Sequence, residues 1–240
     1  MIKKQKLVEF IQRYYLAGNT DSVKLTVKDD EISCTFISDD SNVIGTIVGK
    51  NFTNLEDGEL GIYTTGQLLK MLSVLDADID IDQLKNDNKP YSLKLSDDST
   101  SVSYMLADLA VIKQAPKSKN FPAWDVTIPI TKEFSEKFLK AKSGMPEADN
   151  FAVISNGTDT QVVLNYATIN TNRITFPVHT SSAKSINTTC FSANIFKEIL
   201  AANKGSEEFK IEVSQAGIAK VTCSDSQFES IYYLLKLNIQ

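Results

Sequence analysis

The strongest constraint on the fold is an internal repeat at a nearly constant offset. Amphipathic segments early in the chain return about 127 residues later, and the aromatic and apolar positions return with them. The matched pairs are Leu7–Phe134, Ile11–Phe138 and Arg13–Lys140 at an offset of 127, and Tyr63–Phe191, Leu68–Phe196, Met71–Ile199, Leu72–Leu200, Tyr104–Tyr232 and Leu106–Leu234 at 128. One such match arises by chance, but three regions in chain order at one offset predict a duplicated domain.

The sequence of each half predicts a few helices and many hairpins. Apolar residues recur at helical spacing in residues 3–16, 64–75, 131–142 and 191–205, with Ser192 as a helix cap and Gly205 as a stop. Alternating residues around tight turns predict hairpins over 23–36, 91–106, 151–166 and 209–223, followed by a last strand over 230–237. The sequence therefore predicts an α+β fold of two duplicated domains, each with two helices on antiparallel sheet.

The domain limits follow from the repeat and from one irregular segment. Residues 110–126 are rich in Pro, Lys and Ser without a clear period, and we expect them to connect the domains while anchoring apolar side chains. We predict a first domain over 1–109 and a second over 127–240, a size that suits 240 residues.

Several function classes lack support in the sequence. The three cysteines are widely spaced and His179 is the only histidine, so we expect no zinc site, no cofactor and a reducing cytoplasmic location. No apolar run is long enough for a spanning helix, and the basic, amphipathic start does not resemble a signal peptide. The alternating aspartates of 76–82 suit a strand with one wet face better than a calcium loop, and Asn156-Gly157 suits a hairpin turn better than a glycosylation site.

Charge is segregated between the helices and the rest of the chain. The predicted helical segments 1–17, 64–75, 131–142 and 191–204 hold eleven of the 25 Lys and Arg but only four of the 30 Asp and Glu. These segments are therefore net +7, and the remainder is −12 in a chain of net charge −5. A lysine-rich helix face is often no more than a solvated surface, but the same bias on equivalent helices favours a polyanion site.

The whole pattern resembles the DNA sliding clamps of T-even-like bacteriophages, which share the fold of the proliferating-cell clamp. The resemblance is carried by GIYTTGQLLKMLSVLDADIDI at 61–81, by FPAWDVTIPITKEFSEKFLKA at 121–141 and by ESIYYLLKLNIQ at the C-terminus. It covers the whole chain but is spread over patterning, because clamps have no catalytic signature.

The resemblance implies a ring of three copies that encircles double-stranded DNA without sequence specificity. It implies no enzymatic activity, an ATP-dependent clamp loader that opens the ring, and tethering of the replicative DNA polymerase through a C-terminal peptide docked near the connector. Basic helix residues expected to face the DNA are Lys3, Lys6, Arg13, Lys70, Lys132, Lys137, Lys140, Lys197 and Lys204. Apolar residues expected at the partner pocket are Val111, Ile112, Pro122, Trp124, Tyr232 and Leu234.

Two other classes of function remain as alternatives. A non-ring nucleic-acid-binding or scaffold protein of the replication machinery would suit the basic faces, although a single-strand binder needs aromatic side chains among the lysines, and here they fall on the opposite side. An enzyme acting through His179 or a carboxylate pair has no supporting motif.

Overall fold

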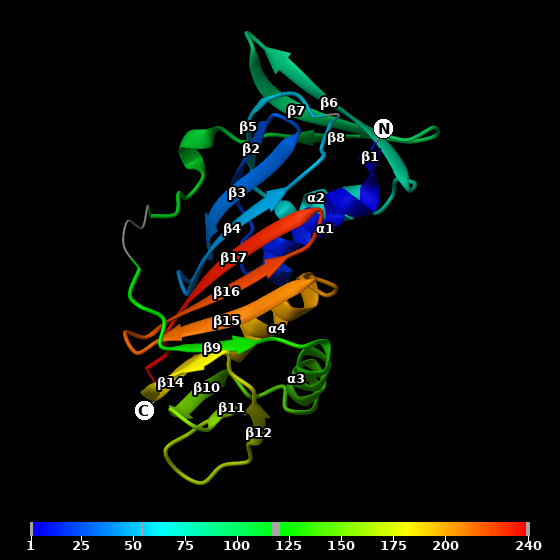
Figure 1. The fold of residues 1–240 in the computed structure, drawn as a ribbon. Helices are drawn as coiled ribbons and strands as arrows, with labels where there is room; N and C mark the ends of the chain where they lie inside the picture. Colours follow the sequence, from blue (N-terminus) through cyan, green and yellow to red (C-terminus); the bar gives the residue numbers. More distant parts are fainter. Residues whose placement is uncertain (1, 54, 117–120, 239–240) are drawn as a thin grey trace. The chain divides into compact units, whose positions relative to one another are not determined.

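The computed structural model describes residues 2–53, 55–116 and 121–238, which form two compact units (Figure 1). The first unit comprises Met1–Pro116 together with Ser226–Ser230, and the second comprises Lys117–Asp225 together with Ile231–Gln240. The division at residue 116 falls inside the segment 110–126 that was predicted as a connector.

The first unit contains two helices and two antiparallel sheets. One sheet has the strand order β1-β6-β7-β8, and four further strands follow the order β4-β3-β2-β5. The elements are β1 (Ile2–Lys3), α1 (Lys4–Tyr15), η1 (Leu16–Gly18), β2 (Val23–Lys28), β3 (Glu31–Ile37), β4 (Val43–Gly49), β5 (Gly58–Ile62), α2 (Thr65–Leu72), β6 (Asp78–Asn86), β7 (Lys89–Ser96), β8 (Ser101–Met105) and η2 (Leu109–Val111).

The second unit also has two helices among antiparallel strands, with one additional short strand, β13, and its last strand, β17, begins in the part of the chain that belongs to the first unit. Its strands follow the orders β12-β11-β10-β14 and β13-β9-β15-β16-β17. The elements are β9 (Val126–Pro129), α3 (Lys132–Gly144), β10 (Asn150–Asn156), β11 (Thr160–Leu164), β12 (Ile174–Val178), β13 (Ser182–Ala183), β14 (Ser185–Ser192), α4 (Ala193–Ala202), β15 (Glu208–Ser214), β16 (Ile218–Ser224) and β17 (Phe228–Leu235).

The two units repeat one topology. The order β1-β6-β7-β8 of the first corresponds to β9-β15-β16-β17 of the second, and β4-β3-β2-β5 corresponds to β12-β11-β10-β14. In both, the first helix follows the first strand, and the second helix precedes the last three strands. The predicted α+β fold, with two helices on antiparallel sheet in each half, is confirmed. Assembly into a ring stays a prediction.

Apolar helix faces make the core of each unit, as the periodicity predicts. In α1 the buried side chains include Phe10, Ile11 and Tyr14, while α4 buries an equivalent stripe of Ile195, Phe196, Ile199 and Leu200. In the second unit the ring of Phe138 lies 5.1 Å from that of Phe196, edge to face, a favoured aromatic geometry. Both rings also contact Phe151 of the strand that follows α3, at 5.8 Å for Phe138 and 4.7 Å for Phe196, so the two helices are joined to each other and to a sheet.

The local signals that predicted turns and caps also hold. Asp29 and Asp30 have positive φ values of 51° and 63° in the β2–β3 turn, as a type I′ hairpin requires. The Ser192 side chain accepts a hydrogen bond from the Ile195 N–H and caps α4. In β6, Ile79 and Ile81 are buried beside exposed aspartates, so the DADIDID segment is a strand with one wet face. No helix among the described residues is long and apolar enough to cross a membrane.

Candidate nucleic-acid interface and partner surfaces

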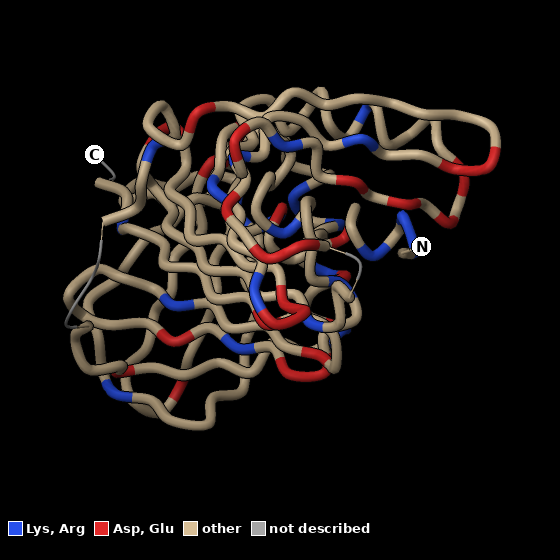
Figure 2. Tube along the Cα trace, turned by 90° about the horizontal axis from the view of Figure 1, so that it is seen from above, with Lys and Arg blue, Asp and Glu red and all other residues tan. Residues whose placement is uncertain are grey.

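Exposed lysines lie on the helical segments and also on strands and turns of the described residues. Figure 2 shows basic residues beside the label N and elsewhere along the trace, with acidic residues spread along it as well. Of the nine lysines and arginines predicted to face DNA, six are exposed, two are half-buried and one is buried. The exposed ones are Lys3, Lys70, Lys132, Lys137, Lys140 and Lys204.

Helix α3 presents two exposed lysines on one face. Thr131 caps the helix by accepting the Phe134 N–H at 3.1 Å, which fixes the first turn and therefore the phase of every later side chain. Lys137 and Lys140 are three residues apart and lie on one face. Lys137 pairs with Glu133 at 2.6 Å, and the pKa of the Glu133 carboxyl is lowered by its hydrogen bond with Lys137.

Three of the exposed cations have no acidic partner. Lys70, Lys140 and Lys204 form no ion pair with any residue that the structure describes. By contrast, Lys132 lies 4.0 Å from Glu136, and Lys3 lies 2.7 Å from Asp78. An unpaired exposed ammonium is the group most readily available to a phosphate, because no competing carboxylate must be displaced.

Lys6 and Lys197 are half-buried, and the ammonium group of each already interacts with another group of the chain. Lys6 Nζ donates to the Asn51 carbonyl at 2.9 Å and lies 4.7 Å from the ring centroid of Phe52. Partial burial lowers the pKa of Lys6. Lys197 pairs with its neighbour Glu198 at 3.0 Å. Both stay predicted DNA contacts, but their ammonium groups already have partners within the chain.

The prediction that Arg13 faces outward is wrong. Its side chain is only 4% exposed, its guanidinium carbon lies 4.0 Å from the Phe228 ring centroid, and Nη1 donates to the Glu9 carbonyl. Arg13 lies one helical turn beyond buried Phe10, so it flanks the apolar face, and its long stem packs there. Lys142, counted among the basic helix residues, is likewise buried and donates to the Pro146 carbonyl at 2.6 Å.

Tyr232 and Leu234, predicted at the partner pocket, are core residues instead. Tyr232 is 0% exposed, and its hydroxyl accepts a hydrogen bond from Asn203 Nδ2 at 2.9 Å. Leu234 is equally buried. The two side chains occupy the inner face of β17, as the period of two along a strand requires, so they are not accessible to a partner peptide.

The outer face of the same strand carries an aromatic cluster that the sequence did not indicate. Tyr233 stacks on Phe121, with ring centroids 4.2 Å apart and planes 6° apart, and Trp124 lies 6.4 Å from Phe121. Phe121 remains 41% exposed, and Lys220 Nζ lies 5.9 Å from the Trp124 ring. Pro122 is half-buried between the two connector aromatics. We call Phe121, Trp124 and Tyr233 the aromatic cluster.

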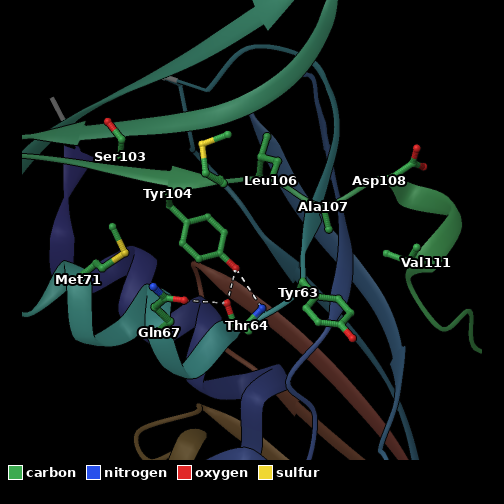
Figure 3. A pocket seen from close by; sticks show the side chains of 11 residues that line it. Tyr63, Thr64, Gln67, Met71, Ser103, Tyr104, Leu106, Ala107, Asp108 and Val111 are labelled. Carbon is green, nitrogen blue, oxygen red and sulfur yellow. Dashed lines mark hydrogen bonds between the residues drawn. The ribbon is translucent and has the colours of Figure 1, made fainter.

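Val111 and Ile112 belong to the first unit and have different surroundings. Ile112 is buried, whereas Val111 is 61% exposed at the rim of a cavity of about 660 Å³ between α2 and the segment 103–111 (Figure 3). Tyr63, Met71 and Met105 supply much of its apolar lining. At its base, the Thr64 N–H donates to the Tyr104 hydroxyl at 3.1 Å. We call this the α2–β8 cavity.

The metal-ligating and nucleophilic side chains of the described residues are scattered or buried. They contain no group of three or more His, Cys, Asp or Glu side chains placed to hold a metal ion. Cys34, Cys190 and Cys223 are buried. Burial raises the pKa of the Cys34 thiol and raises that of Cys190 to about 11, so these two thiols are protonated near neutral pH.

Comparisons with known proteins give a consistent result at the level of structure. The sequence matches no protein-family model and no curated protein. The structure is similar to that of Proliferating Cellular Nuclear Antigen from Entamoeba histolytica, with a TM-score of 0.75, 14% identity, and coverage of 98% of this chain and 96% of that one. It is also similar to A. fulgidus PCNA in a structure with the C-terminal region of FEN-1 bound, with a TM-score of 0.76, 12% identity, and coverage of 100% and 98%.

At these identities the similarities show the fold and not the source, so an origin in T-even-like bacteriophages stays a prediction. They extend over nearly the full length of both chains, so both duplicated units are included. The chain thus has the fold of the sliding clamps called PCNA.

Proposed function

We propose that this protein is a DNA sliding clamp that forms a ring of three copies around duplex DNA. The observation that carries the proposal is the similarity to PCNA over 98–100% of the chain, because a clamp acts through its fold rather than through a catalytic site. The net charge of +7 on the predicted helical segments, in a chain of net charge −5, supports the same function.

Lysine chemistry suits a ring that must hold DNA and still slide. Phosphates carry no sequence information, so contacts from exposed lysines such as Lys137 and Lys140 attract the duplex without fixing a register. Their ammonium groups sit on flexible stems and re-pair easily from phosphate to phosphate. The acidic remainder of the chain disfavours binding elsewhere on the surface.

The proposed partners are the replicative DNA polymerase, which docks a C-terminal peptide, and an ATP-dependent loader that opens the ring. The structure with the C-terminal region of FEN-1 bound to A. fulgidus PCNA supports a peptide mode for this fold. In this chain the aromatic cluster of Phe121, Trp124 and Tyr233 is an exposed apolar surface of the required chemistry. The protein itself is proposed to be non-enzymatic.

The decisive experiment compares retention on closed circular DNA with retention on the same DNA after linearisation. After loading by the cognate loader and ATP, we expect the protein to stay on the circle and to leave the linear form through its ends. Blocking both ends of the linear DNA with bound protein should restore retention.

Equal retention on circular and linear DNA would contradict encirclement and favour the alternative, a non-ring nucleic-acid-binding or scaffold protein of the replication machinery. Light scattering without DNA supplies an independent check. We expect about three times the chain mass of 26.6 kDa at high protein concentration, and a monomer at all concentrations would contradict the ring.

A further inference from the structure

One side of the aromatic cluster is fixed by a strand. Tyr233 lies on the outer face of β17, and its neighbours Tyr232 and Leu234 are buried on the inner face. The strand pairs with β16, so its backbone is held in the sheet. Leu235, two residues further along the outer face, is 42% exposed. The Tyr233 ring therefore has a fixed place on the sheet, beside further apolar surface.

The other side of the cluster is a segment without backbone anchors. Residues 121–124 make no backbone hydrogen bond with any other described residue. The chain is first tied down at Asp125, whose N–H donates to the Val213 carbonyl at 2.9 Å and whose carboxylate accepts a second backbone N–H at 2.9 Å. Phe121 precedes that anchor by four residues. It is held on the sheet by ring contacts, chiefly with Tyr233.

The ring of Phe121 covers the outward face of Tyr233. The two rings are nearly parallel, since their planes are 6° apart at a centroid distance of 4.2 Å. The Phe121 side chain still exposes 41% of its surface, so the stack is open on its solvent side. Any aromatic ring from outside the chain that stacks on Tyr233 must therefore take the position that Phe121 now fills.

We propose that Phe121 is an internal placeholder at the partner site, and that an aromatic side chain of the partner peptide displaces it from Tyr233. The occupant is an aromatic side chain because the chain itself fills the position with one. Exchanging one ring for another preserves the stacking on Tyr233. Residues 121–124 break no backbone hydrogen bond when they move. The inference rests on the proposed docking of a peptide at the aromatic cluster.

A placeholder reverses the sign expected of a residue at a docking surface. The apparent affinity for the peptide is reduced by the fraction of molecules in which Tyr233 is covered. Removing the Phe121 ring should therefore strengthen peptide binding, although it takes an apolar side chain away from the surface. A residue that only contributes contacts to the docking surface would have the opposite effect, because its truncation removes those contacts.

A series of substitutions at Phe121 measures this competition. We expect Phe121→Ala to bind the fluorescein-labelled C-terminal peptide of the replicative polymerase about fivefold more tightly, the effect of losing one competing aromatic pair. Phe121→Leu keeps an apolar side chain without a stacking ring and should have an intermediate affinity. Phe121→Trp brings a larger ring and should bind the peptide more weakly than the unaltered protein. Fluorescence anisotropy measures all four affinities.

Ile169→Ala is the matched control. Ile169 is 72% exposed in the same unit and is not part of the aromatic cluster, so its truncation removes exposed apolar surface without uncovering Tyr233. We expect its peptide affinity to be unchanged. Urea unfolding checks that every variant is folded. Weaker or unchanged peptide binding by Phe121→Ala would overturn the placeholder.

A fluorine label follows the displacement itself. With para-fluorophenylalanine incorporated at position 121, the fluorine resonance should move toward that of the free amino acid in water as the peptide saturates the site. A resonance that keeps its peptide-free position in the saturated complex would show that the ring never leaves Tyr233, and the proposal would be overturned.

The outcomes also separate this inference from the proposed function. Peptide binding that Tyr233→Ala abolishes and Phe121→Ala does not strengthen would reject the placeholder and keep the docking site. Peptide that binds neither the unaltered protein nor Phe121→Ala would reject both. Retention of the unaltered protein on circular DNA would leave the clamp function standing in either case.

Discussion

The role of a residue in this chain depends on which face of its helix or strand it occupies. Tyr232 and Tyr233 are adjacent in sequence, yet one lies in the core against Asn203 and the other stacks on Phe121 at the surface. Tyr104 matches Tyr232 in the repeat and is buried as well, with its hydroxyl accepting the Thr64 N–H. The repeat therefore contained a signal that Tyr232 is a core residue, and the strand period then assigns Tyr233 to the outside.

Lys137 and Lys140 provide the sharpest test of the basic helix face. Replacing both with Glu should weaken binding to duplex DNA and make it less sensitive to salt, because each lost phosphate contact lowers the log–log salt slope by about 0.9. Binding titrations across salt concentrations measure this slope. Changing both Lys28 and Lys89 to Glu, at exposed hairpin ends, is the charge-matched control. Equal losses from the control and the helix variant would show a bulk charge effect instead.

The aromatic cluster makes a second prediction at this scale. Tyr233→Ala should weaken binding of a polymerase C-terminal peptide because it removes the surface ring that stacks on Phe121. Tyr232→Phe should leave peptide affinity unchanged but lower the free energy of unfolding by about 1 kcal/mol, because the hydrogen bond from Asn203 is lost. Peptide titration by fluorescence anisotropy and urea unfolding separate these effects. Peptide affinity that depends on Tyr232 alone would place the docking surface elsewhere.

At the scale of elements, local sequence signals predict where helices begin more closely than where they end. Helix α3 extends to Gly144, two residues beyond the predicted segment, and α2 ends at Leu72, three residues before its predicted end. Caps explain the beginnings better than the ends: Thr131 and Ser192 accept N–H groups, whereas Thr64 makes no capping bond and its hydroxyl bonds to Gln67.

Because Thr131 caps its helix and Thr64 does not, replacing each with Ala should change the free energy of unfolding by different amounts. Thr131→Ala should lower the free energy of unfolding by about 1 kcal/mol, since it leaves the Phe134 N–H without its side-chain acceptor. Thr131→Ser should recover most of the loss. Thr64→Ala removes no capping bond and should cost less. Urea unfolding of the three variants measures the order, and a larger loss at Thr64 would contradict it.

The β7–β8 turn predicts a pH dependence. The Asp97 carboxylate accepts N–H groups of Asp76, Ser99 and Thr100, and these bonds lower its pKa to about 2. A depressed carboxyl pKa stabilises the fold above the unfolded-state pKa of about 4, and the contribution is lost as pH falls toward 2. The stability difference between the unaltered protein and Asp97→Asn should therefore shrink between about pH 4 and pH 2. Urea unfolding across this range measures it, and a constant difference would show that Asp97 does not titrate there.

The whole molecule combines an acidic chain with basic helices. For the proposed clamp, meeting DNA and staying on it therefore have different physical causes. In the proposed clamp, we expect encounter with DNA to depend on exposed lysines such as Lys70 and Lys140 and therefore to be sensitive to ionic strength. Retention by a closed ring depends on enclosure, which salt does not screen.

This contrast predicts two salt dependences for one protein. Raising salt from about 50 mM to 200 mM should weaken binding to a short linear duplex severely, by analogy with other phosphate-contacting proteins. The loaded protein on circular DNA should stay bound over the same range. Dissociation rates after a salt jump measure both. Equal salt sensitivity on the two substrates would show that retention is electrostatic and not topological.

The sequence by itself determined the duplicated α+β fold, four helices and the principal hairpins, because hydrophobic period, caps and turn residues act over a few residues and are visible in one dimension. It also determined that the predicted helical segments carry a net positive charge in an acidic chain. Only the tertiary structure decided which individual side chains are accessible. Arg13 packs over Phe228, more than two hundred residues away in sequence, and Phe121 stacks on Tyr233, more than one hundred residues away. The strand order of each sheet likewise depends on long-range pairing, which local periodicity cannot specify.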